Sequence, residues 1–204
     1  MPAVLNAVRN ACIKFCEGTL LWTYTLDRIS VEANEDEYTL TIPEAQYGTI
    51  ISVDDVKYKI DGADDDQFIT LDPLSKNQKD LWDSGSWPFR TSTSSSHYYV
   101  DKDKTLFLYM IPTEDSDEGL LVRVNLRPIR TTTVVQTFLY TNHYETIGKG
   151  AKADLFARKA QPWYDPNLAS MYSVSFHNDI NDAMAVKTSG YTKRPSQVRL
   201  RDFY

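Results

Sequence analysis

The sequence has few of the residues and motifs on which catalytic and metal sites depend. Among 204 residues there are only two cysteines and three histidines. No phosphate-binding glycine loop, nucleophile elbow or zinc-binding His-Glu-x-x-His motif occurs in it. The cysteines, Cys12 and Cys16, are four residues apart on a predicted helix, where a disulfide between consecutive turns would restrain almost nothing. We therefore expect buried structural thiols in a protein that is not an enzyme and has no cofactor and no bound metal.

The chain also lacks an excess of positive charge and any long hydrophobic run. Its formal net charge is -6 and its pI is near 5.1, which argues against a protein that grips nucleic acid through counterion release, because that mode needs a basic contact surface. Near the N-terminus, Arg9 and Lys14 interrupt the apolar residues, so neither a signal-peptide core nor a membrane span is predicted. We expect a soluble protein that is made inside a cell.

Two groups of side chains are candidates for ligand binding. Carboxylates cluster at residues 35–37 and 61–66, and oxygen-rich loops can hold Ca²⁺, but the ligand positions of an EF-hand are absent. Trp82, Trp87 and Tyr98 could stack on sugar rings, as in a carbohydrate-binding β-sandwich. Aromatic residues of this kind are more typical of cores and protein interfaces. A carbohydrate-binding module is therefore an alternative function of a different class.

The first predicted element is a helix over residues 3–17. Its apolar residues recur with the spacing of one helical face: Leu5, Val8, Cys12 and Phe15. Gly18 follows this face and is typical of the residue just past a helix end, because glycine adopts a left-handed conformation easily. The sequence therefore predicts that the helix stops there.

From residue 20 to residue 139 the spacing changes from helical to the two-residue alternation of strands. The alternation is clearest in Tyr38-Leu40-Ile42, Ile51-Val53, Val56-Tyr58-Ile60 and Leu120-Val122-Val124-Leu126. Short connections rich in turn-forming residues suit antiparallel strands, whereas parallel strands need long crossovers. The pattern predicts an antiparallel β-sandwich or a barrel-like body.

The clearest predicted hairpin joins residues 105–112 to residues 119–128 through an acidic turn at 113–118. The second strand alternates, and its wet face is predicted to carry Arg123, Asn125 and Arg127. The first strand is apolar on both faces, so either its own fold covers both faces or a partner chain covers one of them. Its candidates for a subunit interface are Phe107, Tyr109 and Ile111.

Residues 140–186 are predicted to form two helices joined by a proline-bracketed turn. Asp165 before Pro166 is typical of a helix start, because the carboxylate caps free N–H groups and proline is tolerated at the first position. The first apolar face is predicted to contain Tyr144, Gly148, Ala151 and Leu155, and Ile147 and Ala153 widen it. The second is predicted to contain Leu168, Tyr172, Phe176, Ile180 and Met184. Gly148 and Gly150 indicate that another backbone approaches closely, since each glycine costs about 1 kcal/mol in a helix. In the turn, Trp163 and Tyr164 are further candidates for a subunit interface.

The last segment, residues 188–204, is basic and ends in apolar residues. Its candidates for docking on a partner are Lys193, Arg194, Arg199, Leu200, Arg201, Phe203 and Tyr204. A disordered tail is one interpretation of this composition. The other is an arm that becomes ordered when its charges meet an acidic groove.

Together these elements predict an α+β protein. Its antiparallel, sandwich- or barrel-like middle is flanked by an N-terminal helix and a C-terminal αα-hairpin, and an extended C-terminal arm follows. Residues 1–187 are predicted to form a single domain, because a chain of this length suits one core, and residues 188–204 form the arm.

Several segments of this chain follow one another in a specific order. They are Phe15-Cys16 near the end of the first helix, Trp22 after it, residues 38–43, Trp87-Pro88-Phe89, the strand at 106–112, and residues 122–128 and 148–153. The most specific part is residues 162–172, PWYDPNLASMY, before a last helix with Phe176 and Ala183. Over residues 1–187 this order of features resembles the head-to-tail adaptor, or connector, proteins of tailed bacteriophages.

The resemblance implies a structural protein of the virion neck that is made in the host cytoplasm. Such a protein forms a homo-oligomeric ring, usually twelvefold, beneath the portal protein, and a tail or next neck protein binds its other side. DNA is expected to pass through the channel without specific binding, and no membrane is involved. The C-terminal arm is expected to dock on the portal. A tail-completion or stopper protein, which would bind a neighbouring neck ring instead, is the closest alternative.

Overall fold

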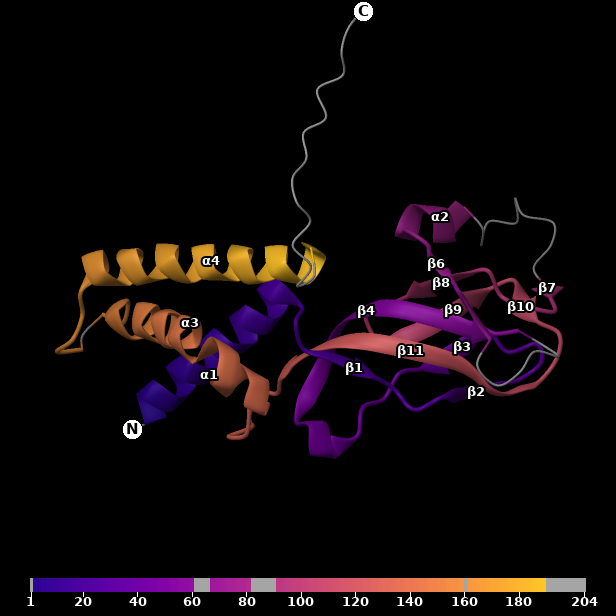
Figure 1. The fold of residues 1–204 in the computed structure, drawn as a ribbon, viewed down its shortest axis with the longest axis horizontal. Coiled ribbons are helices and arrows are strands. Elements are labelled where there is room, and N and C mark those ends of the chain that lie inside the picture. Colours follow the sequence, from indigo (N-terminus) through magenta and orange to yellow (C-terminus); the bar gives the residue numbers. More distant parts are fainter. Residues whose placement is uncertain (1, 61–66, 82–90, 160, 190–204) are drawn as a thin grey trace, which may run out of the picture.

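The computed structural model describes residues 2–60, 67–81, 91–159 and 161–189. The molecule is elongated, with the long helices at one end and the strands, with a short helix beside them, at the other (Figure 1). The helices are α1 (Pro2–Thr19), η1 (Glu44–Gln46), α2 (Lys76–Leu81), α3 (Thr137–Phe156) and α4 (Pro166–Ser189). The strands are β1 (Thr23–Thr25), β2 (Ile29–Val31), β3 (Glu37–Thr39), β4 (Gly48–Lys59), β5 (Phe68–Thr70), β6 (Asp72–Pro73), β7 (Thr91–Ser92), β8 (His97–Val100), β9 (Thr105–Tyr109), β10 (Ile111–Pro112) and β11 (Ser116–Pro128).

The predicted fold class is confirmed: the protein is α+β, with an antiparallel, sheet-rich middle between an N-terminal helix and C-terminal helices. Sheet A has the strand order β1-β11-β4-β5, and β2 also pairs with β11. Sheet B has the order β3-β9-β8-β6, and β7 pairs with β10. The β6–β8 and β7–β10 pairs are parallel. The described strands do not close into a barrel, so the body is an open arrangement of sheets.

The long strands β4 and β11 show how bulges place apolar residues in the core. On β11 the predicted alternation is confirmed, since Leu120, Val122, Val124 and Leu126 are all fully buried. Their partners on β4 are Tyr58, Val56, Val53 and Ile50. Asp54 and Ile51 have no partner in this register, so each forms a β-bulge that shifts the following residues to the other face. The alternation therefore misplaces Ile51, and Ile50 is buried instead.

The predicted hairpin between residues 105–112 and 119–128 is wrong. β9 pairs with β3 and β8 in sheet B, whereas β11 pairs with β1, β2 and β4 in sheet A. Between β9 and β10 the chain turns at Met110, which has a φ of 66°. Alternation indicates which side chains point inward but does not identify the neighbouring strand, which depends on contacts distant in sequence.

At the other end, α1, α3 and α4 pack together as a helical bundle. The predicted start of α4 is confirmed, because Asp165 Oδ1 accepts hydrogen bonds from the N–H groups of Asn167 and Leu168 at 2.9 and 3.0 Å. α1 continues to Thr19, and the left-handed residue after it is Leu20, with a φ of 52°, rather than Gly18. At Gly18 a Cβ would lie 2.7 Å from Ile180 Cγ2, so this glycine lets α4 approach α1.

The apolar face predicted for α3 is correct only in part. Ile147 and Ala151 are buried, but the side chain of Tyr144 is exposed and its hydroxyl donates to Glu145 Oε1 at 3.0 Å. The ring of His143 packs on Phe15 instead, with 4.6 Å between the ring centroids. His143 has non-helical angles, so α3 is kinked there. The kink places an imidazole where a regular face predicts tyrosine.

The apolar face predicted for α4 is also wrong at the C-terminal end of the helix. Phe176 and Ile180 are buried as expected, whereas Met184 is 48% exposed. A helix turns about 100° per residue, so positions four apart drift by about 40° at each step. A line of such positions therefore leaves the buried face, and Lys187 is the partly buried residue near the end of α4.

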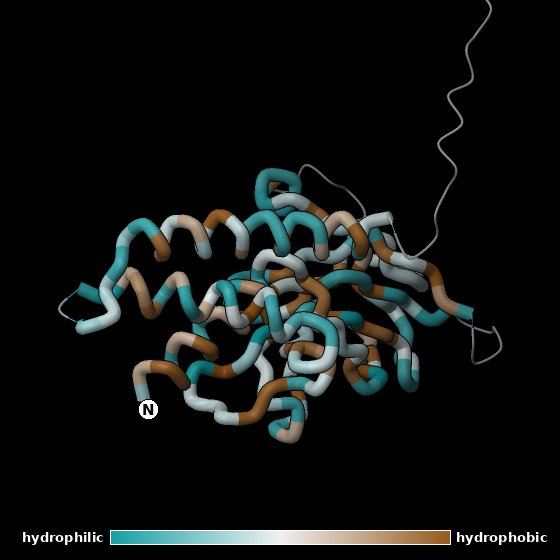
Figure 2. Tube along the Cα trace, turned by 60° about the vertical axis from the view of Figure 1, so that its left-hand side comes forward, coloured by the Kyte–Doolittle hydropathy of each residue, from teal (hydrophilic) through white to brown (hydrophobic). Residues whose placement is uncertain are grey.

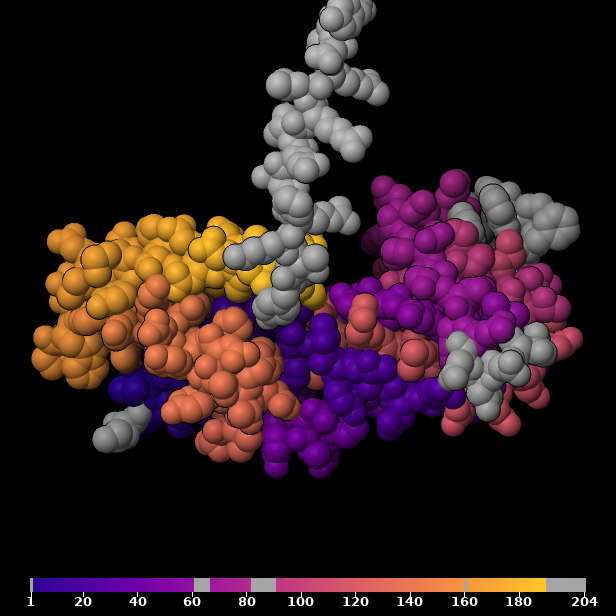
Figure 3. Space-filling view, in the orientation of Figure 1, coloured from indigo at the N-terminus to yellow at the C-terminus, as the bar shows by residue number. Residues whose placement is uncertain are grey.

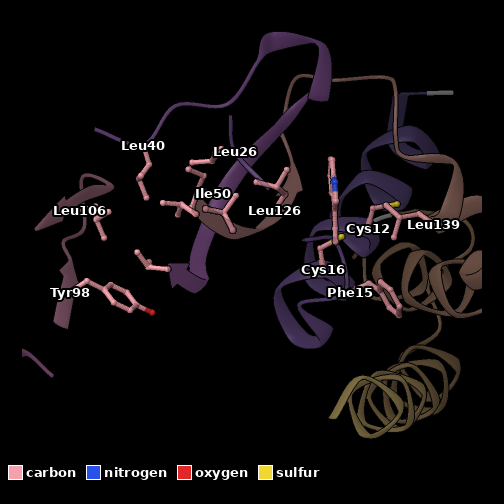
Figure 4. Packing of buried hydrophobic residues seen from close by; sticks show 14 of the residues in the cluster. Cys12, Phe15, Cys16, Leu26, Leu40, Ile50, Tyr98, Leu106, Leu126 and Leu139 are labelled. Carbon is pink, nitrogen blue, oxygen red and sulfur yellow. The ribbon is translucent and has the colours of Figure 1, made fainter. Parts of the chain in front are cut away.

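One buried cluster runs through both ends of the molecule. Figure 4 shows Cys12, Phe15 and Leu139 among the helices and Leu40, Leu106 and Tyr98 among the strands, with Leu126 between the two groups. Phe15 and Leu139 are completely buried. Because the helices and the sheets share this cluster, the bundle stabilises the body.

The observed boundaries differ slightly from the predicted ones. α3 begins at Thr137 rather than at residue 140, because β11 ends at Pro128 and a loop precedes the helix. α4 extends to Ser189, so the C-terminal arm begins beyond the predicted residue 188. Among the described helices, none combines the length and the hydropathy that crossing a membrane would need.

Candidate interaction surfaces

The first candidate surface is the N-terminal half of α1. Cys12 and Phe15, in the C-terminal half, are at most 2% exposed, but Val4, Leu5 and Val8 are 51%, 46% and 38% exposed. Figure 2 shows hydrophobic residues next to the N-terminus, and Figure 3 shows α1 atoms emerging below those of α3 at the helical end. We call Val4, Leu5 and Val8 the α1 patch. Ala7, in the same half of the helix, is completely buried. The bundle therefore covers the Ala7 side and leaves exposed the patch, which continues the apolar stripe of Cys12 and Phe15.

The second candidate surface is the outer side of α4. The residues that follow one line along this side are Asn167, Met171, Val174, Asn178, Asn181 and Ala185, and all of them are exposed. None of these side chains is charged, and Met171 and Val174 are 55% and 59% exposed. Protein interfaces are typically depleted of charge at their centre and enriched in methionine. This outer line of α4 therefore has the composition of a contact surface.

The predicted interface residues of the turn before α4 lie at the helical end. Trp163 and Tyr164 are each 42% exposed. In Figure 1 the chain between α3 and α4 forms the tip of the molecule that is farthest from the sheets. These aromatic side chains therefore belong to a different surface from the strand candidates.

The strand candidates are largely covered by the protein itself. On β9, Leu106 and Leu108 are buried, whereas Phe107 and Tyr109 are only partly buried, as is Ile111 on β10. Tyr99 lies 6.3 Å from the Phe107 ring, and Lys79 Nζ of α2 lies 5.4 Å from it. β9 is also an interior strand of sheet B. Most of its apolar surface is thus covered within the fold. Of the two predicted alternatives, this favours coverage by the protein itself over coverage by a partner chain.

The third candidate surface is the acidic end of the β-rich body. The loop between β2 and β3 lies beside the turn before β11, since Asp115 Oδ1 accepts a hydrogen bond from Ala33 N at 2.7 Å and Pro112 O accepts one from Asn34 N at 2.8 Å. The carboxylates gathered there are Glu32, Glu35, Asp36, Glu37, Glu114, Asp115, Asp117 and Glu118. Arg28 Nη1 pairs with Glu118 at 2.7 Å. This end is therefore strongly negative.

A polar junction fixes the end of α4 to sheet A. Lys187 Nζ donates to Leu20 O at 2.6 Å and to Asn125 Oδ1 at 3.2 Å, and it lies 3.7 Å from Asp54 Oδ1. Asn125 was predicted to lie on a wet face, but it is only 2% exposed because α4 covers it. Its amide donates to Ser52 Oγ at 3.1 Å. The junction fixes where the chain leaves α4, although Arg123 on the same face remains exposed.

The two cysteines of the chain are buried in α1. Burial raises the pKa of Cys12 to about 11 and that of Cys16, which also lies beside Cys12 and Glu17, to about 12. Both thiols are free. Across the described residues, no group of His, Cys, Asp and Glu has an arrangement that could hold a metal ion, and this includes the carboxylates at 35–37.

Tyr98 is not a sugar-stacking platform. It is 7% exposed, so its ring faces the core. Burial and then the carboxylates of Asp55 and Asp54 raise the pKa of its hydroxyl. The carbohydrate-binding alternative loses this residue, and the other two aromatic candidates, Trp82 and Trp87, lie outside the described residues.

Other predicted features also lie outside the described part of the chain. They are the carboxylates at 61–66, the segment 87–89, and the arm residues Lys193, Arg194, Arg199, Leu200, Arg201, Phe203 and Tyr204. The roles expected for these residues therefore stay predictions.

Sequence reasoning missed the outer line of α4 and the polar junction. The line has a signal in the sequence, because uncharged residues recur at helical spacing from Asn167 to Ala185. The junction has none, since Lys187, Asn125 and Leu20 are distant in sequence and Lys187 resembles any lysine at a helix end.

Comparison with known proteins gives no family for this chain: no protein-family model matches the sequence, and no curated protein matches it.

Proposed function

We propose that this chain is a structural subunit of the neck of a tailed bacteriophage, where copies form a ring that joins the portal to the tail. The observation that carries the proposal is the α1 patch. An amphipathic helix whose apolar stripe continues beyond its own bundle leaves Val4, Leu5 and Val8 in water, and a neighbouring copy would cover them.

A ring also needs a second, different surface on each copy, because contacts around a ring are heterologous. The outer line of α4 supports this requirement, since its exposed side chains are uncharged and include Met171 and Val174. The turn with Trp163 and Tyr164 adds exposed aromatic residues at the helical end. These surfaces provide the unlike patches from which a closed ring is built.

The charge distribution suits a ring through which DNA passes. The net charge is -6, and carboxylates are concentrated at the end of the body around Glu35, Asp115 and Glu118. Repeated around a channel, such carboxylates would repel the DNA phosphates and prevent binding during passage. In this proposal the arm at residues 190–204 contacts the portal.

The partner is identified by a pull-down of the full chain on two immobilised rings. One is the portal ring of the same virion, and the other is the ring of the next neck protein. The proposal predicts retention on the portal at a stoichiometry of one chain per portal subunit. Retention only on the next neck ring would overturn it in favour of a stopper or tail-completion protein, and retention on neither would overturn both.

A further inference from the structure

A groove runs along the open side of the β-rich body, between sheet A and sheet B. It is lined by residues of the segment from Leu26 to Pro43, which contains β2 and β3, and has a volume of about 740 Å³. Its apolar lining includes Leu26 and Tyr38, which are 5% and 8% exposed, and the partly buried Ile29 and Ile42. The groove can therefore accommodate apolar side chains in the space between the two sheets.

Both strands beside the groove are edge strands. Among the described strands, β2 pairs only with β11 and β3 pairs only with β9. Leu40 N–H donates to Lys104 O, and Asp36 O accepts from Leu108 N–H. Backbone groups of successive residues point to opposite sides of a strand, so those of Glu37 and Thr39 point away from β9. An extended peptide could pair with this edge, as in recognition by strand addition.

The rim of the groove is acidic. Its carboxylates are Asp27, Glu32, Glu35 and Glu37. Within the described residues no ion pair joins any of these carboxylates to a lysine or arginine. The one cation of the lining, Arg28, pairs with Glu118 at 2.7 Å and lies 5.5 Å from the Phe68 ring centroid. The groove therefore favours a peptide that is apolar on one side and basic on the other.

We propose that this groove binds the C-terminal segment of a second copy of the chain as an added strand along β3. Residues 198–201, Val-Arg-Leu-Arg, alternate apolar and basic side chains. In an extended conformation Val198 and Leu200 share one side, and Arg199 and Arg201 share the other. The first pair fits the apolar lining, and the second pair meets the carboxylates of the rim.

The position of α4 favours delivery by a second copy. Lys187 holds the end of α4 over Asn125 on the outer face of sheet A, whereas the groove opens at the edge where β2 and β3 lie. Residues 190–204 have a contour length of about 50 Å when fully extended. A segment from the same chain would have to turn around the edge of sheet A first.

This inference needs only a second copy and does not rest on the proposed function. The arm contacts the portal in that proposal, so the groove and the portal are alternative sites for the same residues. A copy whose arm binds the portal leaves its neighbour's groove free. The test below contains no portal, so its failure leaves the proposed function standing.

The test mixes two full-length proteins, one with Thr39→Cys at the groove edge and one with Gln197→Cys in the arm. Thr39 shares the strand face of Glu37, and Gln197 shares the side of Arg199 and Arg201. On mild oxidation we expect a covalent heterodimer. The matched control replaces Thr39→Cys with Glu114→Cys, which lies outside the groove lining, and should give at least tenfold less heterodimer. Cys12 and Cys16 are buried and do not compete. Absence of the heterodimer, or an equal yield with Glu114→Cys, would overturn the inference.

Charge reversal then tests the recognition itself. Glu35→Lys with Glu37→Lys, added to the groove protein, should lower the yield roughly tenfold, because two attractive charge pairs become repulsive. Arg199→Glu with Arg201→Glu in the arm protein should restore it. Glu114→Lys with Asp117→Lys makes the same change in net charge outside the groove lining and should leave the yield unchanged. An equal loss of heterodimer with that control, or no restoration by the arm variant, would show that only general charge attraction operates. Either result would contradict specific binding in the groove.

Discussion

At the scale of residues, the two glycines of α3 have opposite relations to their surroundings. A Cβ at Gly150 would lie 2.9 Å from the ring of Phe176 and 3.0 Å from Ala11 Cβ, whereas a Cβ at Gly148 would meet nothing within 4 Å. Gly150 therefore allows three helices to meet closely, and Gly148 does not have this role.

These glycines provide a matched pair of variants. Gly150→Ala should lower the free energy of unfolding by about 1–3 kcal/mol, because the helices must separate to admit the methyl group. Gly148→Ala should raise it by about 0.5–1 kcal/mol, because alanine is the better helix former and fits without contact. Urea denaturation of both variants measures the difference. Equal effects on the two variants would contradict the packing of α1, α3 and α4.

The buried thiols give a second prediction at this scale. Because burial raises the pKa of Cys12 to about 11 and that of Cys16 to about 12, both thiols are almost entirely protonated at pH 8. An alkylating reagent attacks the thiolate, so we expect very slow labelling of the native protein at pH 8 and rapid labelling of both cysteines in guanidinium chloride. Mass spectrometry over time measures this. Rapid native labelling would show that α1 is not packed as described.

At the scale of elements, the sequence predicted well which segments form helices and which form strands, but it did not predict which strands pair. The helical spacing, the cap at Asp165 and the alternation of β11 are local signals, and the structure confirms them. The bulges at Ile51 and Asp54 and the partner of β9 depend on distant segments. For the candidate surfaces, the sequence identified exposed aromatic residues at Trp163 and Tyr164 but not the groove, which forms only where β2 and β3 from different sheets lie near each other.

The pairing of β3 with β9 is testable by a disulfide. Thr39 and Thr105 are directly opposite in the register, at a position between hydrogen-bonded pairs, where Cα atoms are about 4.5 Å apart. Thr39→Cys with Thr105→Cys should therefore form an intrachain bridge under mild oxidation. Each single variant serves as a control for reaction with the native cysteines. If no bridge forms while the double variant remains folded, the order of sheet B is wrong.

At the scale of the whole molecule, the helical end and the acidic end have different chemistry. The helical end exposes uncharged and apolar side chains along α4 and the α1 patch, and the opposite end of the body gathers carboxylates. This division suits a subunit whose helical end contacts other proteins and whose acidic end faces an anionic polymer or a basic segment.

Two variants in one turn of α1 test the role of the α1 patch. Leu5→Asp places a charge within the patch, and Asn6→Asp adds the same charge outside the patch, about 100° around the helix from Leu5. Both positions are exposed, so thermal unfolding should change by less than about 2 °C in each. Leu5→Asp should reduce co-sedimentation with portal rings at least tenfold, because the interface would bury an unpaired charge. Asn6→Asp should bind normally, and an equal loss in both variants would show that the patch has no special role.

The most direct test of the central claim is electron microscopy of the purified full chain mixed with portal rings. The claim is that copies of this chain assemble against one another and against the portal. It predicts an additional ring-shaped layer on one side of the portal, with the same rotational symmetry in class averages. Portal rings that remain bare at saturating protein concentration, while the chain stays folded, would contradict it.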